Sequence, residues 1–212
     1  MRGLLQKDLC LLVQRSRILL VMIGVGILMG FSADGSFVIG YLTMLCAILA
    51  ISTISYDEFD NGYLFLLTLP ITKKVYVYSK YTFCLLADLV GWGISILIYA
   101  GCTIVRGNLL TVEALPETLA FIPVFVLLTA IMLPLQLKFG AEKSRVAIAL
   151  IGGGIFVLIY AGSKLLPEGS NMPEFLWKMS DFAVLLLLIL ISLAATLISY
   201  LCSLHIMEHK EY

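Results

Sequence analysis

The chain has 212 residues, of which 61% are hydrophobic and 13% charged, and its 14 basic residues balance 14 acidic ones. A soluble domain carries roughly 45–50% apolar and about 25% charged residues, and the mean hydropathy here is +1.04. These values exclude a soluble globular protein. They predict an all-α polytopic membrane protein in which residues 1–212 form a single transmembrane domain.

The first predicted element is an amphipathic helix over residues 3–14. Its apolar residues share one helical face: Leu4, Leu5, Leu9, Leu12 and Val13. This pattern is typical of a helix lying in the membrane interface, with a frayed tail as the alternative. Asp8 interrupts the segment and disfavours a cleavable signal peptide.

Six membrane-spanning helices follow. Residues from Ile18 to Ser55 cannot form one span, because at about 1.5 Å per residue they would reach far beyond a core of about 30 Å. Pro123 and Pro134 are expected to kink the fourth span. The predicted spans are approximately 17–33, 36–55, 82–105, 117–137, 145–166 and 182–205.

The basic residues are distributed unequally between the two sides of this arrangement. Three fall outside, namely Arg106, Lys164 and Lys178. The other eleven fall on the side of the termini: Arg2, Lys7, Arg15, Arg17, Lys73, Lys74, Lys80, Lys138, Lys143, Arg145 and Lys210. The asymmetry predicts that both termini face the cytoplasm.

One long polar connection, residues 56–81, joins the second and third spans. It contains an acidic turn with Asp57 and Glu58, an apolar segment from Tyr63 to Leu69, and then Pro70. A short amphipathic helix stopped by proline is expected here. On the cytoplasmic surface it would suit a soluble partner, whereas the alternative is a segment resting in the headgroup layer.

The residues disfavour covalent chemistry. The chain has no phosphate-binding G-x-x-x-x-G-K-[ST] motif, so it cannot use ATP by itself. Its two histidines, His205 and His209, lie at the end of the last span and lack a third metal ligand. The five cysteines have no recurring spacing. We therefore expect no catalytic residue, no metal site and no bound cofactor.

Two polar residues within the spans are candidates for a translocation pathway. Asp88 is expensive to place in hydrocarbon and should face a protein interior or a wet cavity. A structural hydrogen bond to a neighbouring helix is an equal alternative for Asp88 and the favoured one for Gln136. The tyrosines that flank the connection fit an aromatic belt: Tyr56, Tyr76, Tyr78 and Tyr81.

The connection resembles that of a known family. Its Tyr56-Asp57-Glu58, Asn61-Gly62 and Leu67-Thr68-Leu69-Pro70 runs, followed by Lys73-Lys74 and Lys80-Tyr81, are similar to those of type-2 ATP-binding-cassette permeases. Small bacterial members of this kind include peptide exporters such as the phenol-soluble modulin transporters. The amphipathic start of the chain is also similar to that family.

The resemblance implies a permease subunit of an ATP-driven exporter in a bacterial plasma membrane. Two separate ATPase subunits would bind ATP and Mg, and a second permease copy or a paralogue would complete the unit. The cargo would be an amphipathic or hydrophobic peptide, and no nucleic acid is expected. The residues that would couple the chain to the ATPase are Asp57, Glu58, Gly62, Leu64, Leu66, Leu67, Leu69, Pro70, Lys73 and Lys74.

Two other classes of function stay open from the residues alone. One is an intramembrane enzyme, which the absence of a mid-span histidine disfavours. The other is a membrane protein that senses or binds a toxin without pumping it. A neighbouring gene for an ATPase with a phosphate-binding loop would distinguish the exporter from both.

Overall fold

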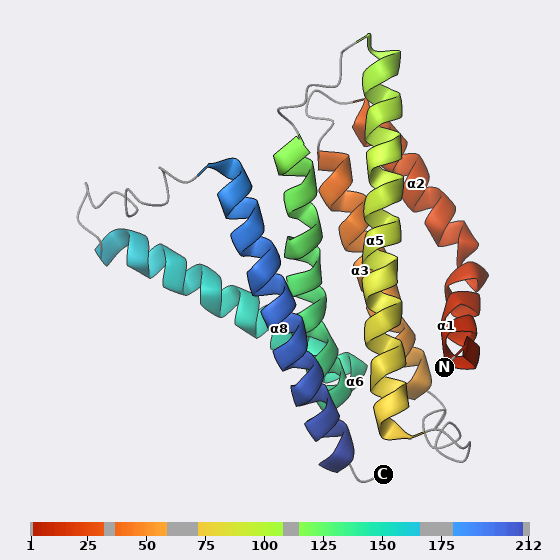
Figure 1. The fold of residues 1–212 in the computed structure, drawn as a ribbon, viewed down its shortest axis with the longest axis vertical. Helices are drawn as coiled ribbons and strands as arrows, with labels where there is room; N and C mark the ends of the chain where they lie inside the picture. The colour runs from red at the N-terminus through yellow and green to blue at the C-terminus, as the bar shows by residue number, and fades with distance from the viewer. Residues whose placement is uncertain (1, 32–36, 59–71, 108–114, 166–179, 210–212) are drawn as a thin grey trace.

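The computed structural model describes residues 2–31, 37–58, 72–107, 115–165 and 180–209, with the backbone alone for 115–117, 141–142, 145, 147–165 and 181. All six elements in these ranges are helices (Figure 1). They are α1 (Arg2–Gln14), α2 (Ser16–Gly30), α3 (Phe37–Glu58), α5 (Lys73–Val105), α6 (Leu115–Leu165) and α8 (Asp181–His209).

Four of the helices stand side by side as a bundle. α3 packs against α5 and α6, and α8 packs against α6 and α5. α2 packs against α3 and α5, and α1, which precedes α2, is bent from it by 65°. The end of α3, the start of α5 and both chain termini lie at the same end of the bundle, the lower end in Figure 1. We call this end the base.

The apolar core is concentrated towards the base. It is formed by side chains from α3, α5, α6 and α8 that pack against one another. Its buried members are Ala50, Ile51, Ile54, Tyr76, Val77, Tyr81, Phe83, Cys84, Leu133, Leu137 and Met207. Many apolar side chains on the outside of the bundle are exposed, including Leu28, Leu97 and Leu197, as expected for helices surrounded by lipid.

The all-α membrane architecture predicted from composition is confirmed. In the described residues, four helical segments are long and apolar enough to cross a bilayer: Phe37–Glu58, Lys73–Val105, Thr118–Gly140 and Phe182–His209. The bent pair of α1 and α2 passes the same test when taken together. The predicted span at 145–166 falls in the second part of α6, where side chains are not described.

The polar connection is shorter than predicted. We expected it to run from 56 to 81, but α3 continues to Glu58 and α5 begins at Lys73. Thr72 caps α5, because its hydroxyl accepts a hydrogen bond from the Val75 amide. The first two turns of α5 also bury Tyr76, Val77 and Lys80. Helix capping and burial therefore extend α5 beyond the apolar run.

α6 contains two predicted spans and one sharp break. The non-helical dihedral angles lie at Gly140 (φ 76°, ψ 176°), not at Pro123 or Pro134. The sharp break thus lies at Gly140, and a smaller bend at the prolines stays a prediction. Neighbouring helices can compensate for a missing backbone donor in a membrane, whereas the conformation at Gly140 is available almost only to glycine. Beyond Gly140 the helix turns away from its first part (Figure 1).

Candidate functional site

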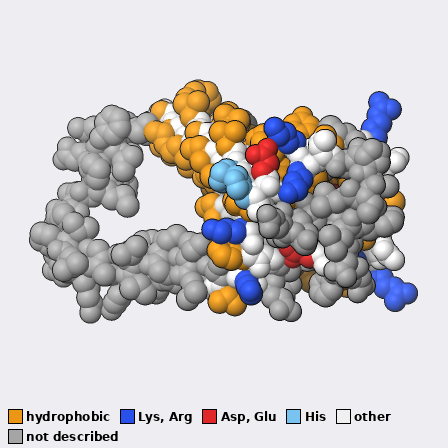
Figure 2. Space-filling model, turned by 90° about the horizontal axis from the view of Figure 1, so that it is seen from below, with side chains coloured by type: hydrophobic (Ala, Val, Ile, Leu, Met, Phe, Trp, Pro, Cys, Tyr) orange, Lys and Arg blue, Asp and Glu red, His pale blue; other side chains and the backbone are white. Residues whose placement is uncertain are grey.

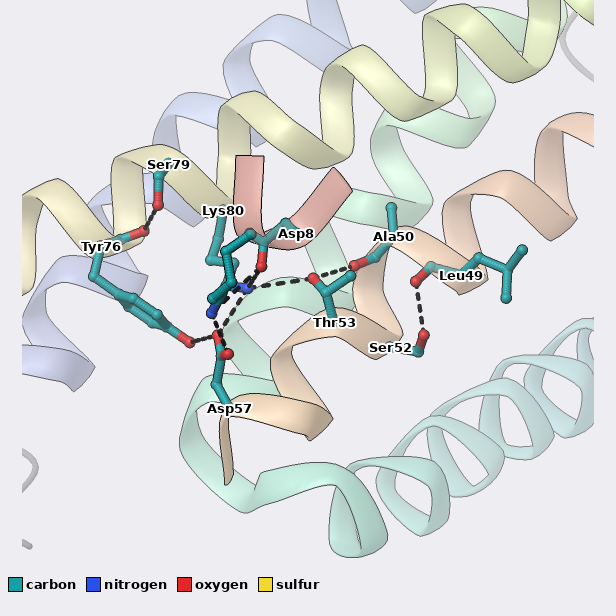
Figure 3. A network of polar contacts seen from close by, with 10 residues as sticks. Asp8, Leu49, Ala50, Ser52, Thr53, Asp57, Tyr76, Ser79 and Lys80 are labelled. Atoms are coloured by element: carbon teal, nitrogen blue, oxygen red, sulfur yellow. Dashed lines mark hydrogen bonds and ion pairs between the residues drawn. The ribbon is translucent and has the colours of Figure 1, made fainter. Parts of the chain in front are cut away.

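Buried charges from three helices meet at the base of the bundle (Figure 3). Asp8 comes from α1, Asp57 from the last turn of α3 and Lys80 from the second turn of α5. Their exposed fractions are only 0%, 5% and 1%. Together with Lys7, which is next to Asp8 and 31% exposed, these residues form what we call the charge cluster.

Lys80 lies at the centre of the cluster. Its ammonium nitrogen is 2.7 Å from Asp8 Oδ1, 2.8 Å from Asp57 Oδ2 and 3.3 Å from Thr53 Oγ1. These three contacts match the three donors of a lysine side chain. The ammonium group also lies 5.6 Å from the centre of the Tyr76 ring. A buried lysine is tolerated here because its charge is paired and hydrogen-bonded.

Asp57 is fully engaged inside the chain. Lys7 donates to Oδ1, whereas Lys80 and the Tyr76 hydroxyl donate to Oδ2, the latter at 3.0 Å. Asp57 was predicted to couple the chain to an ATPase. With its carboxylate occupied by these three groups, it can act on a partner only through the helices that it joins.

The cluster is electrically balanced but incompletely hydrogen-bonded. Lys7 and Lys80 carry two positive charges against the two carboxylates. Asp8 Oδ2 is buried and has no hydrogen-bond partner in the described part of the chain. The cluster thus satisfies charge neutrality while leaving one acceptor unpaired, which weakens its buried state.

The cluster lies where α3 ends and α5 begins. Asp57 is the second-last residue of α3, so the connection of residues 59–72 starts from the cluster on one side. Glu58 lies over the break in α6, since a Cβ placed on Gly140 would be 3.1 Å from its Oε2. Lys73 and Lys74 both contact Glu208 near the end of α8, at 3.3 and 3.5 Å. These contacts join the ends of α3, α5 and α8 and the break in α6 at the base.

The remaining coupling residues fall within the connection itself. Gly62, Leu64, Leu66, Leu67, Leu69 and Pro70 lie outside the described residues. Glu58, Lys73 and Lys74 are brought to the base, as expected for residues flanking the connection. Basic side chains gather on this end among the described residues (Figure 2).

Asp88 and Gln136, the two residues predicted to lie on a pathway, are buried between helices. Asp88 is 2% exposed and accepts a hydrogen bond of 2.8 Å on Oδ2 from Thr129 of α6, while its Oδ1 has no partner among the described residues. Gln136 donates to Ser55 of α3 at 2.7 Å. Both contacts fit the structural alternative weighed for these residues, and a role in translocation stays a prediction.

The Asp88 contact predicts a measurable loss of stability in a Thr129→Val variant. Valine has nearly the shape of threonine, but it would leave both buried oxygens of Asp88 without a donor. We expect the free energy of unfolding to fall by about 1–3 kcal/mol, measured by thermal unfolding in detergent. Thr103→Val is the matched control, because the Thr103 hydroxyl bonds only the Tyr99 carbonyl of its own helix. Equal stability of the two variants would contradict the importance of the contact.

One further interpretation, the aromatic belt, is corrected for two of its residues. Tyr76 and Tyr81 are 3% and 6% exposed, so they do not belong to an aromatic belt. Tyr81 instead joins α5 to α8, with Ser199 and Ser203 at 2.6 and 2.7 Å from its hydroxyl. The rings of His205 and His209 lie 4.3 Å apart between centres and are tilted by 45°. Within the described ranges, no three potential metal ligands come together.

The comparison with protein families decides the class of this chain. A family model described as "ABC-2 family transporter protein" matches residues 3–208. The chain belongs to the ABC-2 transporter family. It is therefore the membrane component of a transporter, and the family implies association with an ATPase. A comparison with curated proteins gives no match.

The matched range of this ABC-2 chain includes the whole charge cluster. The sequence analysis did not predict that these charges come together. Asp8 was interpreted only as evidence against a cleavable signal peptide, and Lys80 only as a basic residue on the side of the termini and as part of the resemblance. A signal was present in α1, because Leu4, Asp8 and Leu12 are spaced four residues apart and so share one helical face. A carboxylate within the buried stripe of a helix requires a cationic partner. The identity of that partner was not visible in the local sequence.

Proposed function

We propose that the chain is the permease subunit of an ATP-driven exporter, with the connection 59–72 as the contact for the ATPase. The observation that carries this proposal is the fixed base of the connection. Buried charges hold the end of α3 to the start of α5, and Glu208 of α8 contacts Lys73 and Lys74. A force applied to the connection would therefore reach α3, α5 and α8 together.

The proposed orientation places the base in the cytoplasm. Basic residues predominate there, and both termini lie at the same end of the bundle (Figure 1). ATP is available on that side of a bacterial plasma membrane, and the chain has no nucleotide-binding motif of its own. Two ATPase subunits and two permease chains would make up the working unit.

The proposed cargo is an amphipathic or hydrophobic peptide, which rests on the resemblance to small peptide exporters. The direct test uses proteoliposomes that contain the permease and the ATPase encoded beside it. A synthetic amphipathic helical peptide should become protected from external protease in inverted vesicles only when ATP is supplied. A scrambled peptide of equal composition is the control. Equal protection of both peptides, or protection without ATP, would contradict a peptide exporter.

Leu66→Glu and Leu67→Glu should uncouple the permease from its ATPase. Apolar residues of a short helix are the anchors in helix-in-groove recognition, and a carboxylate in that groove would be desolvated without a partner. We expect the permease-dependent stimulation of ATP hydrolysis to fall by about tenfold, which corresponds to about 1.4 kcal/mol of lost coupling. Stimulation is measured as the rate of the purified complex relative to the ATPase alone.

Gln14→Glu is the matched control for these variants. It adds the same carboxylate at an exposed position at the end of α1. Native stimulation is expected for it. Native stimulation and native co-purification in the Leu66 and Leu67 variants as well would eliminate this connection as the contact. The apolar segment would then be assigned to the headgroup layer.

A further inference from the structure

α1 is attached to the bundle by charges more than by apolar packing. Of its thirteen residues only Leu4 and Asp8 are buried. Leu5 and Leu12 pack partly against the core, whereas Leu9 and Val13 are 56% and 57% exposed. The ion pairs of Asp8 with Lys80 and of Lys7 with Asp57 are therefore the polar attachments of this helix to α5 and α3.

An attachment made of charges can be released at lower cost than an apolar one. Separated carboxylate and ammonium groups are well solvated by water, whereas apolar side chains torn from a core are not. The cluster is also close to solvent through Lys7, which is 31% exposed. The unpaired Asp8 Oδ2 would gain hydrogen bonds from water on opening. The paired and hydrated states are thus both accessible to these side chains.

The cluster and the bend between α1 and α2 both contact the last turn of α3, from which the connection starts. Arg15, at the bend between α1 and α2, stacks on the Tyr56 ring with 4.7 Å to its centre. Asp57, the next residue, holds Lys7 and Lys80. A displacement of the last turn of α3 would therefore disturb both the bend and the cluster. Contacts hold α1 mainly to α3 and α5. If these contacts were released, α1 would be free to move about the 65° bend that joins it to α2.

We propose that the charge cluster is a releasable tie. It holds α1 against α3 and α5 in the conformation described here, and it opens when the connection 59–72 is driven, so that α1 swings away from the bundle. Lys80 acts as a positioning residue for this movement, since it links Asp8 of α1 to Asp57 and Thr53 of α3 from a third helix. The inference rests on the proposed function, which supplies the force.

The movement can be measured with native cysteines. Cys10 on α1 and Cys202 on α8 are both exposed, whereas Cys84 and Cys102 are buried. Spin labels on Cys10 and Cys202, with Cys46 replaced by serine, report the distance between α1 and the bundle. The labelled chain is diluted with unlabelled chain and purified with the ATPase encoded beside it. Trapping with ATP and vanadate should shift this distance by about 5 Å or more, roughly one helical turn.

A fourfold variant separates a mechanical from a structural role. Asp8→Val, Asp57→Val, Tyr76→Phe and Lys80→Met together replace the three buried charges of the cluster and the Tyr76 hydroxyl by apolar groups, and they keep only Lys7, which is 31% exposed. Replacing buried ion pairs by apolar side chains can preserve or raise stability. We expect this variant to unfold at or above the native temperature and to co-purify with the ATPase. Its Cys10–Cys202 distance should no longer shift, and stimulation of ATP hydrolysis should fall about fivefold or more.

The outcomes are distinguishable. A complex that stimulates ATP hydrolysis but keeps one unchanged Cys10–Cys202 distance in the native chain would overturn the tie and leave the proposed function standing. Native stimulation together with a native distance shift in the fourfold variant would also overturn it. A native chain that neither co-purifies with the ATPase nor stimulates it would overturn the proposed function and the tie with it. The native-chain measurement decides the matter even if the variant does not fold.

Discussion

Replacing Lys80 by methionine is expected to lower the free energy of unfolding by about 3–5 kcal/mol. The substitution keeps the length and apolar stem of the side chain but removes the ammonium group shared by Asp8, Asp57 and Thr53. Two buried carboxylates would then remain with only Lys7 as a cationic neighbour. Breaking a buried ion pair from one side has an effect of this size, because it leaves an uncompensated charge.

The measurement is the midpoint of thermal or chemical unfolding of the purified chain in detergent. Lys74→Met is the matched control, since Lys74 is 70% exposed and pairs with Glu208 at 3.5 Å on the surface. Such exposed pairs contribute at most about 1 kcal/mol. If Lys80→Met and Lys74→Met unfolded at the same midpoint, Lys80 would not be the buried centre described here.

Gly140→Ala is expected to destabilise the protein by about 1–3 kcal/mol for a reason unrelated to charge. At φ 76° and ψ 176°, the backbone of Gly140 occupies a region that residues with a Cβ almost never adopt. The added methyl group would also stand 3.1 Å from Glu58 Oε2, next to the connection. The strain would act on the break in α6 and on the end of α3 together.

Gly101→Ala provides a control of opposite sign. Gly101 is exposed on α5, and an added Cβ there would have no neighbouring atom within 4 Å. Alanine in a helix interior is favoured over glycine by about 0.5–1 kcal/mol. Gly101→Ala should therefore raise the unfolding midpoint while Gly140→Ala lowers it. A neutral Gly140→Ala variant would show that α6 does not need this conformation.

Local sequence was sufficient for most helices but not for their ends. The predicted spans at 82–105 and 182–205 each fall within a described helix, and the span at 36–55 does so from Phe37 onward, because apolar length and helix propensity are local properties. α5 nevertheless starts nine residues earlier than predicted, since Thr72 caps it and the polar residues of its first turns find buried partners. Likewise, the sequence predicted a bend in this region at the two prolines, whereas α6 changes direction at Gly140.

The sequence by itself determined that this protein is an α-helical membrane protein with one long polar connection, and its motifs already resembled the family that the matched range established. Composition and periodicity carry that information residue by residue. Only the tertiary structure decided that Asp8 meets Lys80, 72 residues away, with Asp57 between them. Such a pairing depends on which helix faces pack together, and no local pattern specifies that choice. The reason these charges tolerate burial is the same: each is neutralised by a side chain from another helix.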